Sequence, residues 1–160
     1  MAEDISWQDR LEEQLPLLGH RNWIVVADAA YPWQTAPGVE TVSTGAEQIE
    51  VVKAVFAAVD RALHVRPIVY IDAELSFLME EDAKGINGYR GELIAALTGR
   101  TVKEMPHEEI IAKLDAAGRA FHILLLKTTL TLPYTSVFLE LDCGYWSPEA
   151  EQRLRAVFKP

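Results

Sequence analysis

The sequence has a single cysteine, Cys143, and no long hydrophobic run. One cysteine excludes a disulfide within the chain, and such sparing use of cysteine fits a reducing compartment. No apolar stretch approaches the roughly 20 residues that a membrane-spanning helix needs. The first residues, Met1–Asp4, are acidic and do not resemble a secretory signal peptide. From these absences we expect a soluble, cytoplasmic protein.

Basic residues are scarce as well. Lysine and arginine together number 15 against 24 acidic residues, which gives a formal net charge of -9. A net negative surface argues against nucleic acid or an anionic membrane as a partner. Three chemical motifs are also missing: a glycine-rich phosphate loop, a Cys/His spacing for zinc, and a serine in a nucleophile elbow. We therefore expect no cofactor and no metal site.

The chain does have a hydrophobic content of 49%, enough to build a core, in a length of 160 residues that is typical of one domain. Short apolar runs predict strands, and apolar residues at helical spacing predict helices between them. This alternation favours a mostly parallel sheet covered by helices on both faces. The expected strands are 23–27, 39–43, 68–72, 101–103, 121–126 and 137–141, and the expected helices start near Ser6, Ala46, Tyr89, Pro106 and Ser147.

The segment Leu17–Pro32 offers the first candidate site. It contains the apolar run Trp23–Ala27, which is typical of a strand buried on both faces. His20 lies in a turn before this strand, and Asp28 follows its C-terminal end, where open α/β sheets usually bind ligands. An imidazole can act as a general acid or base near neutral pH, and Asp28 could accept a hydrogen bond from His20 and fix its tautomer. Alternatively, His20 bonds a loop carbonyl and Asp28 caps the turn before Pro32.

These residues resemble the opening of the RbsD/FucU family of ribose pyranases and fucose mutarotases. Members of that family carry Gly-His, a strand, and then Asp-Ala followed closely by Pro, and Gly19–Pro32 matches this order and spacing. A second match is Pro133–Ser136 before an apolar strand. The resemblance covers Leu11 to Tyr145. It implies a three-layer α/β/α sandwich with an RbsD-like, mostly parallel central sheet, formed by residues 1–146, and a C-terminal helical appendage over 147–160.

The resemblance also implies a function. The family's chemistry is the interconversion of sugar anomers or ring forms by general acid–base catalysis, which makes the chain an expected isomerase acting on a monosaccharide. It further implies a homo-oligomeric ring, a pentamer or a decamer, with the sugar site near the subunit boundary. His20 and Asp28 are the expected catalytic pair. His107 is a third catalytic candidate, because ribose pyranases have a histidine on a similar His-Glu helix start. Its alternative is a solvent-exposed residue of the first helical turn.

Four further residues are candidates for sugar binding. Tyr134 offers a hydroxyl for a sugar oxygen and a ring face for its C–H groups, although a tyrosine in such a turn is also a common packing device. Tyr31 could form an aromatic wall, or an interface. Ser136 stands where the family has asparagine, and Leu130 falls in the register of a family Gly-Glu pair. These two departures favour an alternative function, that of a non-catalytic sugar-binding or assembly protein on the same scaffold.

Overall fold

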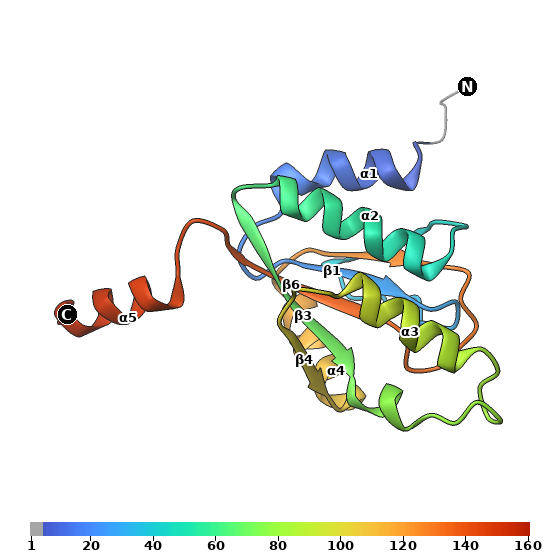
Figure 1. Cartoon of the computed structure of the whole chain (residues 1–160). Coiled ribbons are helices and arrows are strands. Elements are labelled where there is room, and N and C mark those ends of the chain that lie inside the picture. Colours follow the sequence, from blue (N-terminus) through green and yellow to red (C-terminus); the bar gives the residue numbers. More distant parts are fainter. Residues whose placement is uncertain (1–4) are drawn as a thin grey trace.

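The computed structural model describes residues 5–160 and shows a six-stranded sheet with helices on both faces (Figure 1). Met1–Asp4, whose acidic character entered the prediction above, lie outside the described residues. The strands are β1 (Trp23–Ala27), β2 (Val39–Ser43), β3 (Val65–Asp72), β4 (Val102–Met105), β5 (Ile123–Lys127) and β6 (Val137–Cys143). The helices are α1 (Trp7–Gln14), α2 (Gln48–Arg61), α3 (Ile86–Ala96), α4 (His107–Gly118) and α5 (Pro148–Val157), with short 3-10 helices η1 (Leu15–Leu17) and η2 (Ala73–Phe77).

The strand order across the sheet is β2-β5-β1-β6-β3-β4. β5 is parallel to both β1 and β2, and β3 is parallel to β4. β6 is antiparallel to its two neighbours, β1 and β3. Every strand except β6 therefore points the same way, and the carboxyl ends of five strands share one edge of the sheet with the start of β6. The predicted mostly parallel sheet is confirmed.

Two apolar cores lie on the two faces of this sheet. α1, α2 and α3 cover one face, and α4 covers the other (Figure 1). Alternate residues of β1 belong to opposite cores: Ile24 and Val26 pack beneath α2, whereas Trp23 and Val25 pack on the side of Ile110 in α4. All residues of β1 are buried, which confirms the strand predicted to be covered on both faces. The three-layer α/β/α architecture follows from this two-sided burial.

Local sequence signals explain where α1 begins and ends. The hydroxyl of Ser6 accepts a hydrogen bond from the N–H of Asp9 at 3.1 Å, which is the expected N-terminal cap. Pro16 lies just beyond the last residue of α1, in η1, as its missing N–H predicts.

The helix expected from Ala46 begins at Gln48 instead. Its first residues stay outside the helix because the Thr44 hydroxyl bonds locally, donating to the carbonyl of Lys127 and accepting from the N–H of Ala46.

β3 is longer than the predicted strand 68–72, since it begins at Val65. The extension has a partner on one side only: β6 pairs with β3 from Val65 onward, whereas β4 pairs only from Val69. Pro67, which lacks an N–H, therefore lies where β3 has a free edge.

α5 extends away from the rest of the chain (Figure 1). The hydroxyl of Ser147 accepts a hydrogen bond from the N–H of Ala150 at 3.0 Å, so the predicted start of this helix is confirmed. None of its residues is buried within the described chain, and its apolar Leu154 and Val157 are exposed. The boundary expected at residue 146 stays a prediction. Over residues 5–160, none of the helices combines the length and the apolar character required to cross a membrane.

Candidate functional site

The edge of the sheet that carries the carboxyl ends collects most of the predicted site residues. Asp28 follows β1, Ser136 precedes the antiparallel β6, and His107 is the first residue of α4 after β4. Parallel strands end at a common edge, so residues far apart in the sequence meet there. Asp28, Tyr31, His107 and Tyr134 line one pocket of about 560 Å³ at this edge. We refer to it as the His107 pocket.

His107 is held by two carboxylates. Its Nδ1 lies 2.9 Å from Oδ1 of Asp72, the last residue of β3, and its backbone N–H donates to the Glu74 carboxylate at 2.9 and 3.1 Å. The side chain of Asp72 is 1% exposed, whereas that of His107 is 29% exposed and reaches the pocket. Burial raises the pKa of Asp72 to about 6, partly opposed by the hydrogen bond and charge of His107. The second carboxylate oxygen of Asp72, Oδ2, is buried and has no hydrogen-bond partner among the described residues.

Asp28 and Ser136 are brought into direct contact. The hydroxyl of Ser136 donates to Oδ1 of Asp28 at 2.9 Å, and the backbone N–H of Asp28 lies 3.3 Å from the same hydroxyl oxygen. The N–H of Ala30 completes this turn by donating to Oδ2 of Asp28 at 3.4 Å. Ser136 is buried and is engaged by Asp28, so it holds the carboxylate at the pocket instead of facing a ligand.

Two tyrosines form the aromatic part of the pocket. The ring of Tyr134 packs edge-on to the imidazole of His107, with centroids 5.6 Å apart. Its backbone is in the left-handed region, with φ of 57°, a conformation that costs a non-glycine residue roughly 1–2 kcal/mol. Tyr31 is buried, and its hydroxyl has no partner among the described residues. Burial, aided by the charges of Asp115, Asp72 and Asp28, raises the pKa of Tyr31 above its usual value, so the hydroxyl remains protonated and able to donate.

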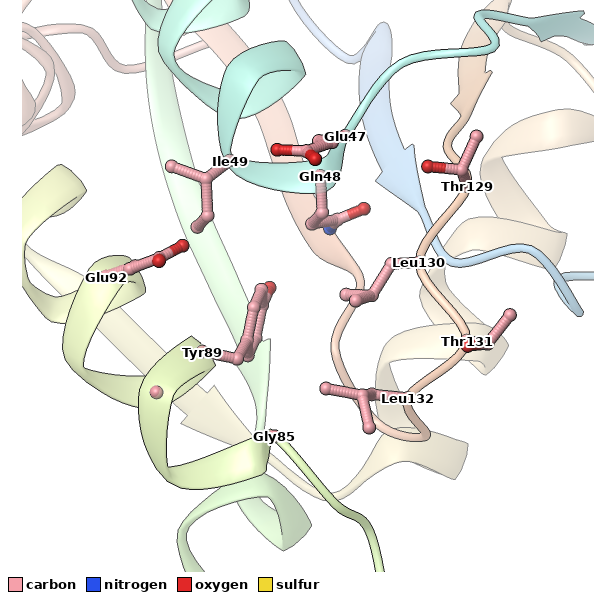
Figure 2. A pocket seen from close by; sticks show the side chains of 11 residues that line it. Glu47, Gln48, Ile49, Gly85, Tyr89, Glu92, Thr129, Leu130, Thr131 and Leu132 are labelled. Carbon is pink, nitrogen blue, oxygen red and sulfur yellow. The ribbon is translucent and has the colours of Figure 1, made fainter.

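Leu130 lies elsewhere. It lines a separate groove of about 360 Å³ between α2 and α3, together with Gln48, Tyr89 and Glu92 (Figure 2). Its carbonyl accepts a hydrogen bond from the N–H of Ala29 at 2.8 Å, which ties the loop after β5 to the loop after β1. Leu130 therefore supports the backbone beside Asp28, and the structure does not place it in the His107 pocket.

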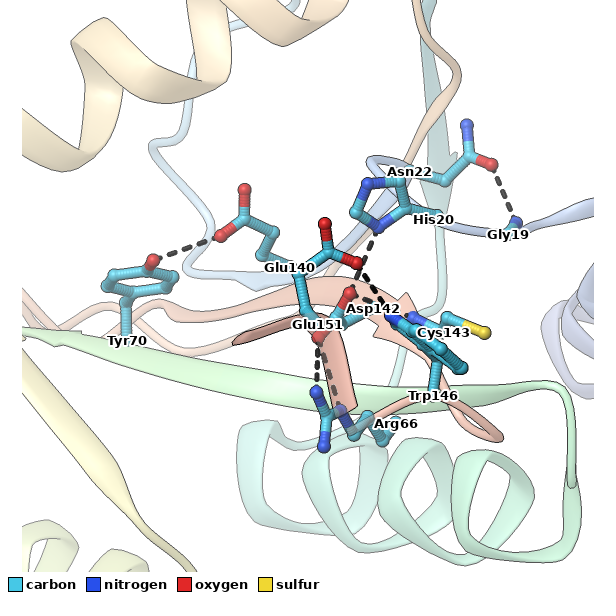
Figure 3. A network of polar contacts seen from close by, with 10 residues as sticks. All are labelled: Gly19, His20, Asn22, Arg66, Tyr70, Glu140, Asp142, Cys143, Trp146 and Glu151. Atoms are coloured by element: carbon cyan, nitrogen blue, oxygen red, sulfur yellow. Dashed lines mark hydrogen bonds and ion pairs between the residues drawn. The ribbon is translucent and has the colours of Figure 1, made fainter. Parts of the chain in front are cut away.

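His20 does not contact Asp28, and the predicted hydrogen bond between them is wrong. The two residues lie at opposite ends of β1, whose five residues span roughly 16 Å. His20 instead contacts Asp142, at the end of β6, with Nδ1 and Oδ1 3.0 Å apart (Figure 3). The other oxygen of Asp142 accepts from the Arg66 guanidinium at 2.6 and 3.2 Å. Nearness in sequence was misleading because an extended strand separates its flanking residues.

The His20 cluster, which we define as His20, Arg66, Asp142 and Cys143, is partly exposed to solvent. The side chain of His20 is 59% exposed and that of Asp142 is 25% exposed. Partial burial acts to raise the pKa of Asp142, but hydrogen bonds from Arg66 and from the N–H of Cys143 outweigh it and hold this pKa below the usual range. The other two histidines have local contacts: His64 bonds two carbonyls near α1, and His122 bonds the side chain of Gln14.

The residue that sequence reasoning missed is Asp72. A signal for it existed, since Asp72 ends a predicted strand on a carboxylate just as Asp28 follows another. Which carboxylate meets which histidine depends on the pairing of β3 with β4, and this pairing is not visible in local patterns. The resulting pocket is lined by an imidazole, three carboxylates (Asp28, Glu108 and Asp115) and two phenols, which suits a ligand with several hydroxyl groups. Residues 5–160 contain no cluster of three or more side chains suited to hold a metal ion.

Comparison with solved structures identifies proteins that share this fold. No family model and no curated protein sequence matches the chain. Among solved structures, RbsD of Bacillus subtilis complexed with D-ribose is 20% identical, with 89% of this chain and 98% of that chain covered and a TM-score of 0.55. FucU of Bifidobacterium longum is 15% identical, with 83% and 93% covered and a TM-score of 0.55. The fucose mutarotase of Streptococcus pneumoniae, in complex with L-fucose, is 17% identical, with 88% and 98% covered and a TM-score of 0.54. The chain has an RbsD/FucU-like fold.

Proposed function

We propose that the chain binds a monosaccharide in the His107 pocket and accelerates the interconversion of its anomers or ring forms. The observation that carries this proposal is the convergence of His107, Asp28 and Tyr134 on one pocket at the carboxyl edge of the sheet. Sugars are bound in two of the solved structures that share this fold. The pocket also offers the groups that the reaction needs, namely proton carriers and donors for hydroxyl oxygens.

The reaction breaks and re-forms one bond of a cyclic sugar. A base takes the proton from the anomeric hydroxyl while an acid gives a proton to the ring oxygen. The bond between the anomeric carbon and the ring oxygen then breaks, and an open-chain carbonyl results. Closure onto either face reverses both proton transfers, so nothing is oxidised and no atoms are gained or lost. His107 is the proposed proton carrier, and Asp28 is its proposed counterpart across the pocket.

His20 can join this chemistry only through a second copy of the chain. Within one chain it lies at the opposite edge of the sheet from His107, since β1 separates it from Asp28. In a ring of subunits, the His20 edge of one copy could face the His107 pocket of the next. We therefore assign the removal of the anomeric proton to His107. Any contribution of His20 depends on the assembly of subunits.

One observation favours a non-catalytic sugar-binding protein as the second candidate. The hydroxyl of Ser136 is bonded to Asp28. A side chain at this position therefore adds no amide contact to a sugar, in contrast to the asparagine of the resembling family. Loss of such contacts weakens binding or alters the preferred sugar. Under this alternative, a sugar would bind to the His107 pocket while its anomers exchange no faster than in buffer.

Exchange NMR on a panel of sugars separates these functions. The rate of anomer interconversion is measured for ribose, fucose, galactose and glucose with and without the protein, and binding is measured in parallel by calorimetry. Acceleration of at least one sugar that also binds would support the proposal. Binding without acceleration would support the second candidate, and the absence of both across the panel would contradict the two functions together.

A further inference from the structure

Asp72 is an unusual carboxylate. Among the described residues it is the one acidic side chain in the buried class, and no lysine or arginine forms an ion pair with it. Among residues 5–160 its only side-chain partner is His107, and its Oδ2 has no partner there. A buried carboxylate with an unsatisfied oxygen is costly to the folded state. Such a group is retained at functional sites more often than in a purely structural setting.

The sheet register explains why Asp72 meets His107. Tyr70 packs in the core on the α4 side and Ile71 in the core on the other side, so the next residue, Asp72, points again toward α4. Asp72 pairs with Met105 of β4, and the chain reaches the first residue of α4 just two positions later. The carboxylate is thus directed at the N-terminus of α4, where His107 begins the helix.

The hydrogen bonds of His107 leave one nitrogen for a ligand. Nδ1 is occupied by Asp72, and the backbone N–H is occupied by Glu74. Nε2 forms no hydrogen bond with any of residues 5–160, while the ring lines the pocket beside Tyr134. A carboxylate can only accept a hydrogen bond, so an ionised Asp72 requires the proton on Nδ1 and leaves the Nε2 lone pair free.

We propose that Asp72 is the positioning residue of the pocket: it holds the proton of His107 on Nδ1 and thereby directs the Nε2 lone pair at the sugar hydroxyl. This inference rests on the proposed function for the identity of the substrate. When Nε2 takes the anomeric proton, the ionised Asp72 stabilises the imidazolium until ring closure returns that proton to the new anomeric hydroxyl. Asp72 does not contact the sugar and acts only through His107.

The charged groups around Asp72 determine the pH above which it is ionised and can hold the proton of His107 on Nδ1. They are His107 from α4, Glu74 from η2 and Asp28 from the loop after β1. The charge of Asp72 also helps to raise the pKa of the Tyr31 hydroxyl, which stays protonated. Burial raises the pKa of Asp72 to about 6, and Glu74 and Asp28 add to the rise, so the carboxyl ionises as the pH passes through that value. The positioning hydrogen bond to an ionised Asp72 is therefore gained on the alkaline side of about pH 6.

The test compares wild type with Asp72→Asn and Asp72→Ala, and uses Asp60→Asn as a matched control on an exposed ion pair. The ¹⁵N shifts of the His107 imidazole at pH 8 should show a proton on Nδ1 in wild type and in Asp60→Asn, and this preference should be lost in both Asp72 variants. The rate of anomer exchange at saturating sugar should fall roughly 10²-fold in both, because the imidazole is no longer aligned as a base. The rise in rate around pH 6 should disappear from the profile of Asp72→Asn.

The outcomes separate this inference from the proposed function. Unchanged His107 shifts in both Asp72 variants would overturn the positioning role, whatever the rates are. A wild-type protein that exchanges no sugar would contradict the proposed function, and the imidazole shifts would still decide what Asp72 does to His107. Amide spectra of each variant show that the fold is retained, and Asp72→Asn, which preserves the shape of the side chain, serves if Asp72→Ala fails to fold.

Discussion

Two histidine–aspartate pairs lie at opposite edges of the same sheet. The Nδ1–Oδ1 distance is 2.9 Å between His107 and Asp72, and 3.0 Å between His20 and Asp142. The first pair contains a carboxylate that is 1% exposed, and the second a carboxylate that is 25% exposed and bonded to Arg66. Burial raises the pKa of Asp72 to about 6, whereas the hydrogen bonds from Arg66 and from the N–H of Cys143 outweigh the burial of Asp142 and hold its pKa below the usual range.

The difference shows that environment, more than residue type, decides what such a pair can do. A guanidinium satisfies Asp142, so its interaction with His20 is a contact in an open surface network, worth little to stability. In the described part of the chain, Asp72 has no cation other than a protonated His107 to balance it, and the low dielectric around it strengthens their coupling. An arrangement of this kind is suited to moving a proton. The predictions below test this contrast, beginning with the largest expected effect.

Replacement of each histidine by alanine should give the largest difference between the two pairs, measured as the rate of anomer exchange. His107→Ala should reduce the rate of anomer exchange roughly 10²–10⁴-fold, the usual loss for one general acid–base group. His20→Ala should lose less, because His20 lies outside the pocket of its own chain. His122→Ala is the matched control, since this imidazole contacts the side chains of Gln14 and Glu40 and belongs to neither pair. A larger loss for His20→Ala than for His107→Ala would reverse the contrast and would place the opposite edge of a second copy in the site.

The two carboxylates should affect stability in opposite directions as the pH changes. The folded-state pKa of Asp72 is raised from 3.8 to about 6, so its contribution is fully present below pH 3.8 and is lost as the pH rises through 6. The free energy of unfolding of wild type, relative to that of Asp72→Asn, should therefore decline by about 2 kcal/mol between pH 4 and pH 7.

The folded-state pKa of Asp142 is lowered, so its contribution is present above pH 3.8 and is lost on further acidification. The same comparison with Asp142→Asn should accordingly show wild type losing relative stability as the pH falls below 3.8. Urea unfolding at several pH values measures both differences. Parallel pH dependences for the two substitutions would show that the pairs are equivalent.

Removal of α5 should have the smallest effect. A chain ending at Trp146 loses a helix with no buried residue, so the free energy of unfolding should change by no more than about 0.5 kcal/mol. α5 borders the His20 cluster, where Glu151 and Arg155 line the same pocket as His20, and it does not border the His107 pocket. Anomer exchange by the shortened protein should thus equal that of the full chain when it is measured at equal protein concentration. A clear loss of exchange would show that α5 supports the site, directly or through assembly.

The sequence predicted the fold better than the site, for a physical reason. Strands and helices arise from local periodicity and burial, so Trp23–Ala27 and the cap at Ser6 were visible in short windows. Asp28 was also visible as a candidate, because it follows a strand at the edge where open α/β sheets bind ligands, and His107 was a candidate through the resemblance to ribose pyranases. Pairing of side chains was not visible, since it depends on strand order and register. That is why His20 was assigned to Asp28 and why Asp72 was missed.

The four histidines of the chain offer a direct measurement of where a sugar binds. Ribose or fucose is titrated into the protein while the imidazole C–H resonances of His20, His64, His107 and His122 are followed by NMR. The account predicts a saturable shift of the His107 resonance, with His64 and His122 unchanged, and the loss of all sugar-dependent shifts in His107→Ala. A sugar that shifts the His20 resonance and leaves that of His107 unchanged would contradict the assignment of the functional pocket.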